Sequence, residues 1–367
     1  MKKLFVILAA VALVWTFAAP ASAVDWNFYG SARMATFYTS NDFGDFDNPQ
    51  GDDGDDGLRW EMQGNSRLGA RVKGETVSGR VELSTFGTDG DDATVGTRLL
   101  YGDWNFGAGS LRVGKSYSPT SQFISTQAFD GDLGLLGIGT FYGRRPAGLT
   151  LSFGGLRVAL LDPETVDTLG TDGEIDSYLP KIEAGWGMAF DAFNFNLMGG
   201  MQYYQVSDAT SGVDGSQNDI DVTSWVVGAD AGFSFGPAYV KGAVSLSQNP
   251  SQYNALVYAY PAAAVWDGDD DTDDTDLIMA ALVAGFKMSD MVAFEVGAGI
   301  ADYDTDCAGC DDTNPWAVYG NATIQLAPGV WIIPEAGYFD FDSVPVDIND
   351  NDAGSSFYVG AKWQLDF

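Results

Sequence analysis

Alternating apolar and polar side chains mark most of this chain, and its last fourteen residues, 354–367, show the pattern most clearly. One face of this stretch is apolar, and the other carries ions, an amide and a phenol. The apolar face holds Phe357, Val359, Ala361, Trp363, Leu365 and Phe367, and the other holds Tyr358, Lys362, Gln364 and Asp366. A dry core on both sides would leave the ions without partners, at a high cost in free energy. The pattern instead predicts a barrel wall with lipid outside and water inside.

The same period of two runs through the first two strands that we expect. In residues 25–39, Trp26, Phe28, Ala32 and Met34 share the apolar face, and Asn27, Tyr29, Ser31 and Arg33 share the polar face. Residues 58–73 then keep a single phase over sixteen positions, which predicts one continuous strand.

The pattern predicts sixteen strands in all, joined alternately by seven tight turns and eight longer loops. An even number lets the first strand pair with the last, so that no backbone edge is left open to hydrocarbon. We therefore expect an all-β fold, a transmembrane antiparallel up-and-down β-barrel of about sixteen strands. The predicted strands are residues 25–39, 58–73, 80–86, 97–106, 111–116, 149–153, 156–161, 177–190, 193–206, 223–235, 238–247, 277–288, 292–301, 316–327, 330–339 and 354–367.

A soluble β-sandwich, or a row of them, is the alternative all-β interpretation, in which the apolar faces form a shared core. The long single-phase strands and the alternation of short turns with long loops argue against it. Two stretches fit the barrel least well. Residues 277–286 are apolar on both faces, and Pro334 removes a hydrogen-bond donor from the predicted strand 330–339.

The N-terminus has the form of a secretory signal. Lys2 and Lys3 precede an apolar run over residues 4–19, and Ala21-Ser22-Ala23 follows as a cleavage site. The run is shorter than the roughly 20 residues that a helical span needs. We expect residues 1–23 to be removed and residues 24–367 to form a single domain, because no linker composition divides them.

The net charge of −33 comes from 51 acidic and 18 basic residues, and it argues against nucleic acid as a partner. The acids are mostly Asp, which favours loops. Basic residues are concentrated: eleven of the sixteen that follow residue 23 lie within residues 33–145. Because a charge facing lipid at mid-bilayer would cost about 2–4 kcal/mol, we expect those on polar faces to point inward. These are Arg33, Arg59, Arg67, Arg71, Lys73, Arg80 and Arg112.

Two short segments resemble the Gram-negative general porins: residues 65–74 (NSRLGARVKG) are similar to their second strand, and residues 113–119 (VGKSYSP) to the strand before their third loop. The terminal Phe367 resembles the assembly signal of bacterial outer-membrane proteins. The resemblance implies a homotrimer of water-filled barrels in the outer membrane, each narrowed by a third loop folded into the lumen. By position, that loop is residues 117–145. We expect the short turns and both termini to face the periplasm.

Within this framework we expect Arg33, Arg67, Arg71, Arg80 and Arg112 to form a basic wall, faced across the lumen by Asp130 and Asp132 of the third loop. Opposite charges across a narrow aqueous gap create a transverse field that favours small polar solutes. The alternative is that these arginines pair along the wall with Glu61, Glu75 and Glu82.

Two acidic loops, residues 42–56 and 267–276, offer oxygen ligands for Ca²⁺ or Mg²⁺, with Asp269, Asp271 and Asp273 as candidates. Neither loop has EF-hand spacing, and a solvated anionic mouth is the alternative. Cys307 and Cys310 are the only cysteines, and in an exported protein they predict a disulfide within one loop.

Enzyme activity is not expected, because the absence of histidine excludes a Ser-His-Asp triad and no P-loop is present. The expected function is a passive diffusion channel for small hydrophilic solutes and ions, surrounded by outer-membrane lipid and lipopolysaccharide. One alternative is a channel selective for sugars or anions, in which Tyr29, Tyr203 and Tyr204 guide a sugar. Another is a plugged structural or surface barrel whose acidic loops bind divalent cations and so bridge to lipopolysaccharide or neighbouring proteins.

Overall fold

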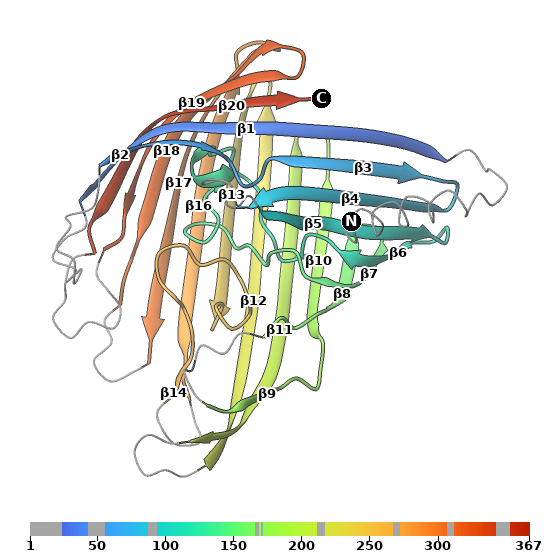
Figure 1. The fold of residues 1–367 in the computed structure, drawn as a ribbon, viewed down its shortest axis with the longest axis vertical. Helices are drawn as coiled ribbons and strands as arrows, with labels where there is room; N and C mark the ends of the chain where they lie inside the picture. The colour runs from blue at the N-terminus through green and yellow to red at the C-terminus, as the bar shows by residue number, and fades with distance from the viewer. Residues whose placement is uncertain are drawn as a thin grey trace, which may run out of the picture.

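The strands close into a single antiparallel barrel (Figure 1). The computed structural model describes residues 24–42, 56–86, 94–165, 169, 172–210, 217–266, 272–306, 312–342 and 353–367. Its elements are β1 (Asp25–Asp42), β2 (Gly57–Met62), β3 (Arg67–Lys73), β4 (Val77–Phe86), β5 (Thr94–Asn105), β6 (Ser110–Lys115), α2 (Phe129–Asp132), β7 (Ala147–Phe153), β8 (Leu156–Leu161), β9 (Glu174–Asp176), β10 (Lys181–Ala189), β11 (Phe193–Thr210), β12 (Gln217–Phe235), β13 (Ala238–Gln248), β14 (Val265–Trp266), β15 (Thr272–Asp273), β16 (Thr275–Lys287), β17 (Val292–Thr305), β18 (Trp316–Ala327), β19 (Val330–Asp340) and β20 (Ser355–Asp366).

Eighteen segments make up the main sheet, and they form sixteen strand positions, or walls, of the barrel. The number is smaller because β2 and β3 run end to end, as do β9 and β10. Both β2 and β3 pair with β1, and both β9 and β10 pair with β11. The ring closes where β1 pairs with β20, from Ser31 opposite Asp366 to Asp42 opposite Ser355. The predicted barrel, its even number of walls and the pairing of its first and last strands are confirmed.

The prediction of one continuous strand over residues 58–73 is wrong, because residues 63–66 interrupt it between β2 and β3. The Ser66 N–H donates to the Gln63 carbonyl at 2.9 Å, which closes a tight turn there. Predicted strand 177–190 is likewise shorter, since residues 177–180 separate β9 from β10. The inward and outward phase survives the first break, because Trp60 before it and Leu68 after it are both exposed on the outer face.

The two faces of the wall differ as the sequence pattern predicts. In β20, Phe357, Trp363 and Leu365 are exposed on the outside, while Tyr358 and Lys362 are buried inside. A wall that exposes large apolar side chains outward has the surface that a hydrocarbon solvent requires. α2 has only four residues, and no helix in the described ranges is long and apolar enough to cross a membrane.

Two connections fold back onto the inner face of the wall, and we call them the inward segment (residues 116–146) and the second inward segment (residues 249–264). Both are visible in Figure 1 among the strands, the first in green after β6 and the second in orange after β13. Phe129, Leu135 and Ile138 of the inward segment pack against side chains of β1, β16, β18, β19 and β20. Tyr253 of the second segment packs with Phe141 of the first.

These contacts explain why residues 277–286 are apolar on both faces. On β16, Leu277, Met279 and Val283 point inward and are buried, in the clusters that the two inward segments complete. Ile278 and Leu282 point outward and are exposed. The inner face of β16 therefore meets packed protein rather than water, and an apolar side chain is stable there.

Candidate functional site

Three glutamates on the wall, Glu183 of β10, Glu295 of β17 and Glu335 of β19, hold the inward segment and are almost fully buried. Glu335 accepts hydrogen bonds from the backbone N–H groups of Ala128 at 2.6 Å and Phe129 at 2.9 Å. Glu295 accepts one from the backbone of the same segment, at Thr126, 2.5 Å away. A buried carboxylate is costly unless it is hydrogen-bonded, and here the segment supplies the donors.

Glu183 joins both inward segments at one point. It accepts hydrogen bonds from the Ser118 hydroxyl and the Thr120 N–H of the inward segment, and from the Tyr253 hydroxyl of the second segment at 2.9 Å. Lys181, also buried, donates to the Tyr253 carbonyl at 3.0 Å. The two segments therefore form one packed layer on the inner face of the walls from β10 to β20 and on part of β1 beside them.

The tip of the inward segment, α2, presents Asp130 and Asp132 to the opposite side. Asp130 and Gly131 have positive φ angles of 48° and 72°, so α2 is not a regular helix. Asp and Gly tolerate this left-handed conformation better than other residues. It directs the acidic side chains away from the packed layer.

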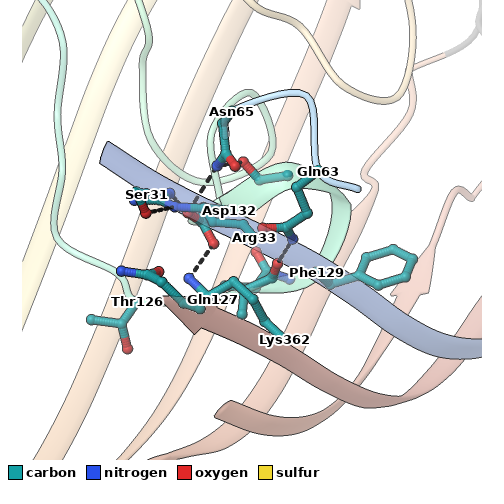
Figure 2. Close-up of polar contacts among 12 residues, drawn as sticks. Ser31, Arg33, Gln63, Asn65, Thr126, Gln127, Phe129, Asp132 and Lys362 are labelled. Carbon is teal, nitrogen blue, oxygen red and sulfur yellow. Dashed lines mark hydrogen bonds and ion pairs between the residues drawn. The ribbon is translucent and has the colours of Figure 1, made fainter. Parts of the chain in front are cut away.

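Asp132 bridges the segment to both closing strands of the barrel, as Figure 2 shows. It pairs with Arg33 of β1, and its other oxygen accepts from Lys362 of β20 at 2.6 Å. Asn65, in the break between β2 and β3, donates to it at 2.8 Å. Burial alone would raise the pKa of Asp132, but the charges of Lys362 and Arg33 and these hydrogen bonds hold it below its usual value of 3.8.

A second group, which we call the Glu82 cluster, lies on the wall formed by β1, β3, β4 and β5. The buried Glu82 carboxylate accepts from Arg80 at 2.6 Å and from Arg98 at 2.7 Å, and Arg67 lies 3.6 Å from it. The Tyr29 hydroxyl donates to it at 2.7 Å. Three guanidinium groups share one carboxylate, so the cluster carries a net charge of +2, from +3 and −1.

The structure brings some of the predicted residues together and separates others. Arg33 meets Asp132, and Arg59 lies 3.3 Å from Asp130, whereas Arg112 pairs with Asp103 of the neighbouring strand at 2.8 Å. The remaining members lie on the same wall. Arg67 and Arg80 belong to the Glu82 cluster, Arg71 stacks 5.1 Å from the Tyr29 ring, and Lys73 ends β3 with its side chain exposed.

Of Glu61, Glu75 and Glu82, which the alternative interpretation pairs with the wall arginines, Glu82 forms such pairs. The described residues record no ion pair for Glu61 or Glu75. The three tyrosines considered for a sugar path do not come together. Tyr29 binds Glu82, Tyr203 donates to Asp221, and Tyr204 is fully buried in another cluster.

Sequence reasoning missed several residues of the site, and Arg98 shows why. The register of β4 and β5 shifts between Glu82 and Leu83, so both Arg98 and Leu99 turn inward and the simple alternation fails. The alternation of side chains predicts Lys362 on the polar face of the last strand, but it gives no reason to expect Lys362 beside Asp132. The wall glutamates offered a usable signal, since Glu is rare among the 51 acids and these three lie within apolar strands.

Four predicted residues, Cys307, Cys310, Asp269 and Asp271, lie outside the described residues, as do residues 1–23. Asp273 ends β15. Within the described ranges, no group of three or more Asp, Glu, Cys or His side chains is arranged to hold a metal ion.

The sequence of residues 9–343 matches the Gram-negative porin family. The chain belongs to this family. As a porin, it is an integral β-barrel of the outer membrane and a diffusion channel, and its family and fold imply a channel rather than an enzyme. No curated protein sequence matches it.

Solved structures show how far the shared fold extends. The porin is similar to the outer-membrane channel DcaP of Acinetobacter baumannii, with a TM-score of 0.69, 17% identity, and coverage of 95% of this chain and 99% of that one. For an anion-selective porin from Comamonas acidovorans, the TM-score is 0.61 at 16% identity, covering 94% and 100%. For the trimer form of OmpT from Vibrio cholerae, it is 0.58 at 14% identity, covering 94% and 100%. At these identities the likeness shows the fold alone.

Proposed function

We propose that this porin passes small hydrophilic anions in preference to cations, along a path between the inward segment and the wall from β1 to β8. The observation that carries the proposal is the Glu82 cluster, with its net charge of +2. The packed layer covers the opposite walls, where the wall glutamates Glu183, Glu295 and Glu335 are buried and accept hydrogen bonds from it. The open side of the lumen therefore presents arginines, while the buried carboxylates are withdrawn from water.

Among the other charged groups along this path, the Arg59–Asp130 and Arg112–Asp103 pairs are neutral, and the group around Asp132 is positive. Asp132 is shared by two cations, Arg33 and Lys362, which leaves a net charge of +1, from +2 and −1. In a narrow passage such fixed charges act on a crossing ion at close range. Exposed charges further than about 10 Å away are screened at 0.1 M salt, so the acidic residues of external loops have less effect on the crossing.

The test is the reversal potential of the purified porin in a planar bilayer under a KCl gradient. Replacing Arg80 and Arg98 with Gln leaves Glu82 with Arg67 alone, and the cluster then has no net charge. We expect the reversal potential to move toward cation preference. The matched control is Lys287→Gln, since Lys287 is exposed at a tight turn and pairs there with Asp290. An unchanged reversal potential in the double variant would contradict the proposal.

We infer further that the porin is a homotrimer with both termini in the periplasm, after removal of residues 1–23. The trimer form of OmpT supports the first point. The second rests on geometry, because the start of β1 and the end of β20 lie beside the tight turns at Gly74 and Gly329. Native mass spectrometry in mild detergent measures the assembly. Outer-membrane lipid and lipopolysaccharide are the expected surroundings of the apolar outer face.

A further inference from the structure

Phe123 of the inward segment is 56% exposed, which is unusual for a large apolar side chain beside a water-filled passage. Its neighbours Gln122 and Ile124 are buried: the Gln122 amide donates to the carbonyls of Ala229 and Val244, and the Ile124 carbonyl accepts from a lysine of β13. The segment is thus pinned on both sides of Phe123. Its ring lies against Tyr117 and Tyr142 of the same segment, and covering its exposed apolar area with a solute would be favourable.

Aromatic rings and arginines surround Phe123 on this side. The Tyr117 ring lies 5.2 Å away and the Tyr142 ring 5.7 Å away, both in edge-on contact. Arg98 lies 5.6 Å from the centre of the Tyr117 ring, and Arg145 lies 5.5 Å from it. Guanidinium groups above aromatic faces create a surface that is both flat and positive.

A cavity of about 420 Å³ opens next to these rings, lined by Tyr117, Phe123, Arg157, Asn196, Met198 and Asp230, among others. The described residues record no ion pair for Arg157. Its guanidinium occupies space that Gly185 leaves free, since a Cβ there would lie 3.2 Å from it and 3.2 Å from the Pro119 carbonyl. Asp230 accepts a hydrogen bond from Asn196 at 2.7 Å.

We propose that this cavity is a binding site for flat aromatic monocarboxylates as they cross the porin. The ring packs against Phe123 and Tyr117, and the carboxylate meets Arg157, whose planar fork of donors matches its geometry. An apolar cavity of about 150 Å³ holds benzene, so the space here takes a substituted ring with water. Asp230 disfavours a second carboxylate on the same ring. The site rests on the proposed function, of which it specifies the solute.

The test uses benzoate as the probe and measures its block of the chloride current through single channels. Cyclohexanecarboxylate has the same charge and a similar size but no flat ring face, and benzyl alcohol has the ring without the charge. We expect benzoate to block at a lower concentration than either. Equal block by benzoate and cyclohexanecarboxylate would overturn the proposal, because charge alone would then account for binding.

Variants separate the two halves of the site. We expect Phe123→Leu, which keeps apolar volume but removes the ring, to raise the half-blocking concentration of benzoate about two- to tenfold. Arg157→Gln should raise it about tenfold or more, because it removes a charged hydrogen-bond donor. Lys287→Gln and Phe190→Leu remove a charge and a ring from tight turns outside the cavity, and they should leave the block unchanged. If benzoate blocks the two site variants at the same concentration as wild type, the site does not exist.

A calorimetric titration of benzoate into the detergent-solubilised porin decides the site without any current. If the protein does not conduct, or conducts without preferring anions, the proposed function fails while this titration still measures the site. If the protein prefers anions but shows no heat of benzoate binding that Phe123→Leu reduces, the site fails while the proposed function stands.

Discussion

Glu335 offers the sharpest test of how the inward segment is held. Its carboxylate accepts the N–H groups of Ala128 and Phe129, and the Tyr358 hydroxyl and the Asn321 amide at 3.0 Å each. A hydrogen bond to a charged group contributes about 1.5–3 kcal/mol, so the two backbone bonds together contribute about 3–6 kcal/mol to holding the segment. Replacing Glu335 with Leu removes both and leaves the buried donors without an acceptor.

Glu335→Gln gives an intermediate perturbation. Its amide oxygen still accepts one backbone N–H, while its NH₂ group faces the other donor, so about half of the stabilisation is lost. The stack of the Phe129 ring on the Tyr358 ring, 3.9 Å apart at 13°, is kept in both variants. We therefore expect local opening of residues 126–132 rather than release of the whole inward segment.

Single-channel recording measures this opening, with Tyr358→Phe as the control that removes one hydroxyl and keeps the ring. We expect open-channel noise and mean conductance to increase in the order wild type, Gln variant, Leu variant, with the control close to wild type. Glu335 would have no role in holding the segment if the Leu variant conducted as quietly as wild type. A control as noisy as the Leu variant would assign the effect to Tyr358 instead.

Three further predictions concern other contacts. The pKa of Asp132 lies below 3.8, so its carboxylate bridges the two cations at higher pH. The bridge is lost as the pH falls through the lowered pKa, and channel noise should rise only in that acidic range. Asp103→Asn frees Arg112 from its partner, and the reversal potential should move further toward anions; movement toward cations would count against the basic path. At Gly299 an added Cβ would lie 3.0 Å from the inward segment's backbone, so Gly299→Ala should destabilise the porin by about 1–3 kcal/mol. Heat denaturation in detergent measures this change. The control is Gly320→Ala, where the atom nearest to an added Cβ is 3.5 Å away.

The wall of this barrel could be predicted from the sequence because each of its features is local. Alternation depends only on neighbours two residues apart, and it placed Trp363 outside and Lys362 inside in agreement with their exposure. Closure follows from an even number of walls, and β1 does pair with β20. The tight turn at Gly154 and Gly155, with φ angles of 51° and 93°, is equally local.

The lumen could not be predicted in the same way, because its contacts join residues far apart in the chain. Glu335 binds Ala128 across 207 positions, and no period in either segment encodes that pairing. Local irregularities add a second source of error. The shift of register at Glu82 turned Arg98 inward, and the break at residues 63–66 placed Asn65 on Asp132.

The lumen contains two kinds of carboxylate, which differ in the groups that neutralise them. The wall glutamates lie buried under the inward segment, where their carboxylate oxygens accept hydrogen bonds from its N–H groups. Asp132 and Glu82 each face more than one cation and leave positive charge in excess. A chain with a net charge of −33 can therefore still line its passage with cations. Solute preference follows from where the unneutralised charges lie, and it cannot be inferred from the charge of the whole chain.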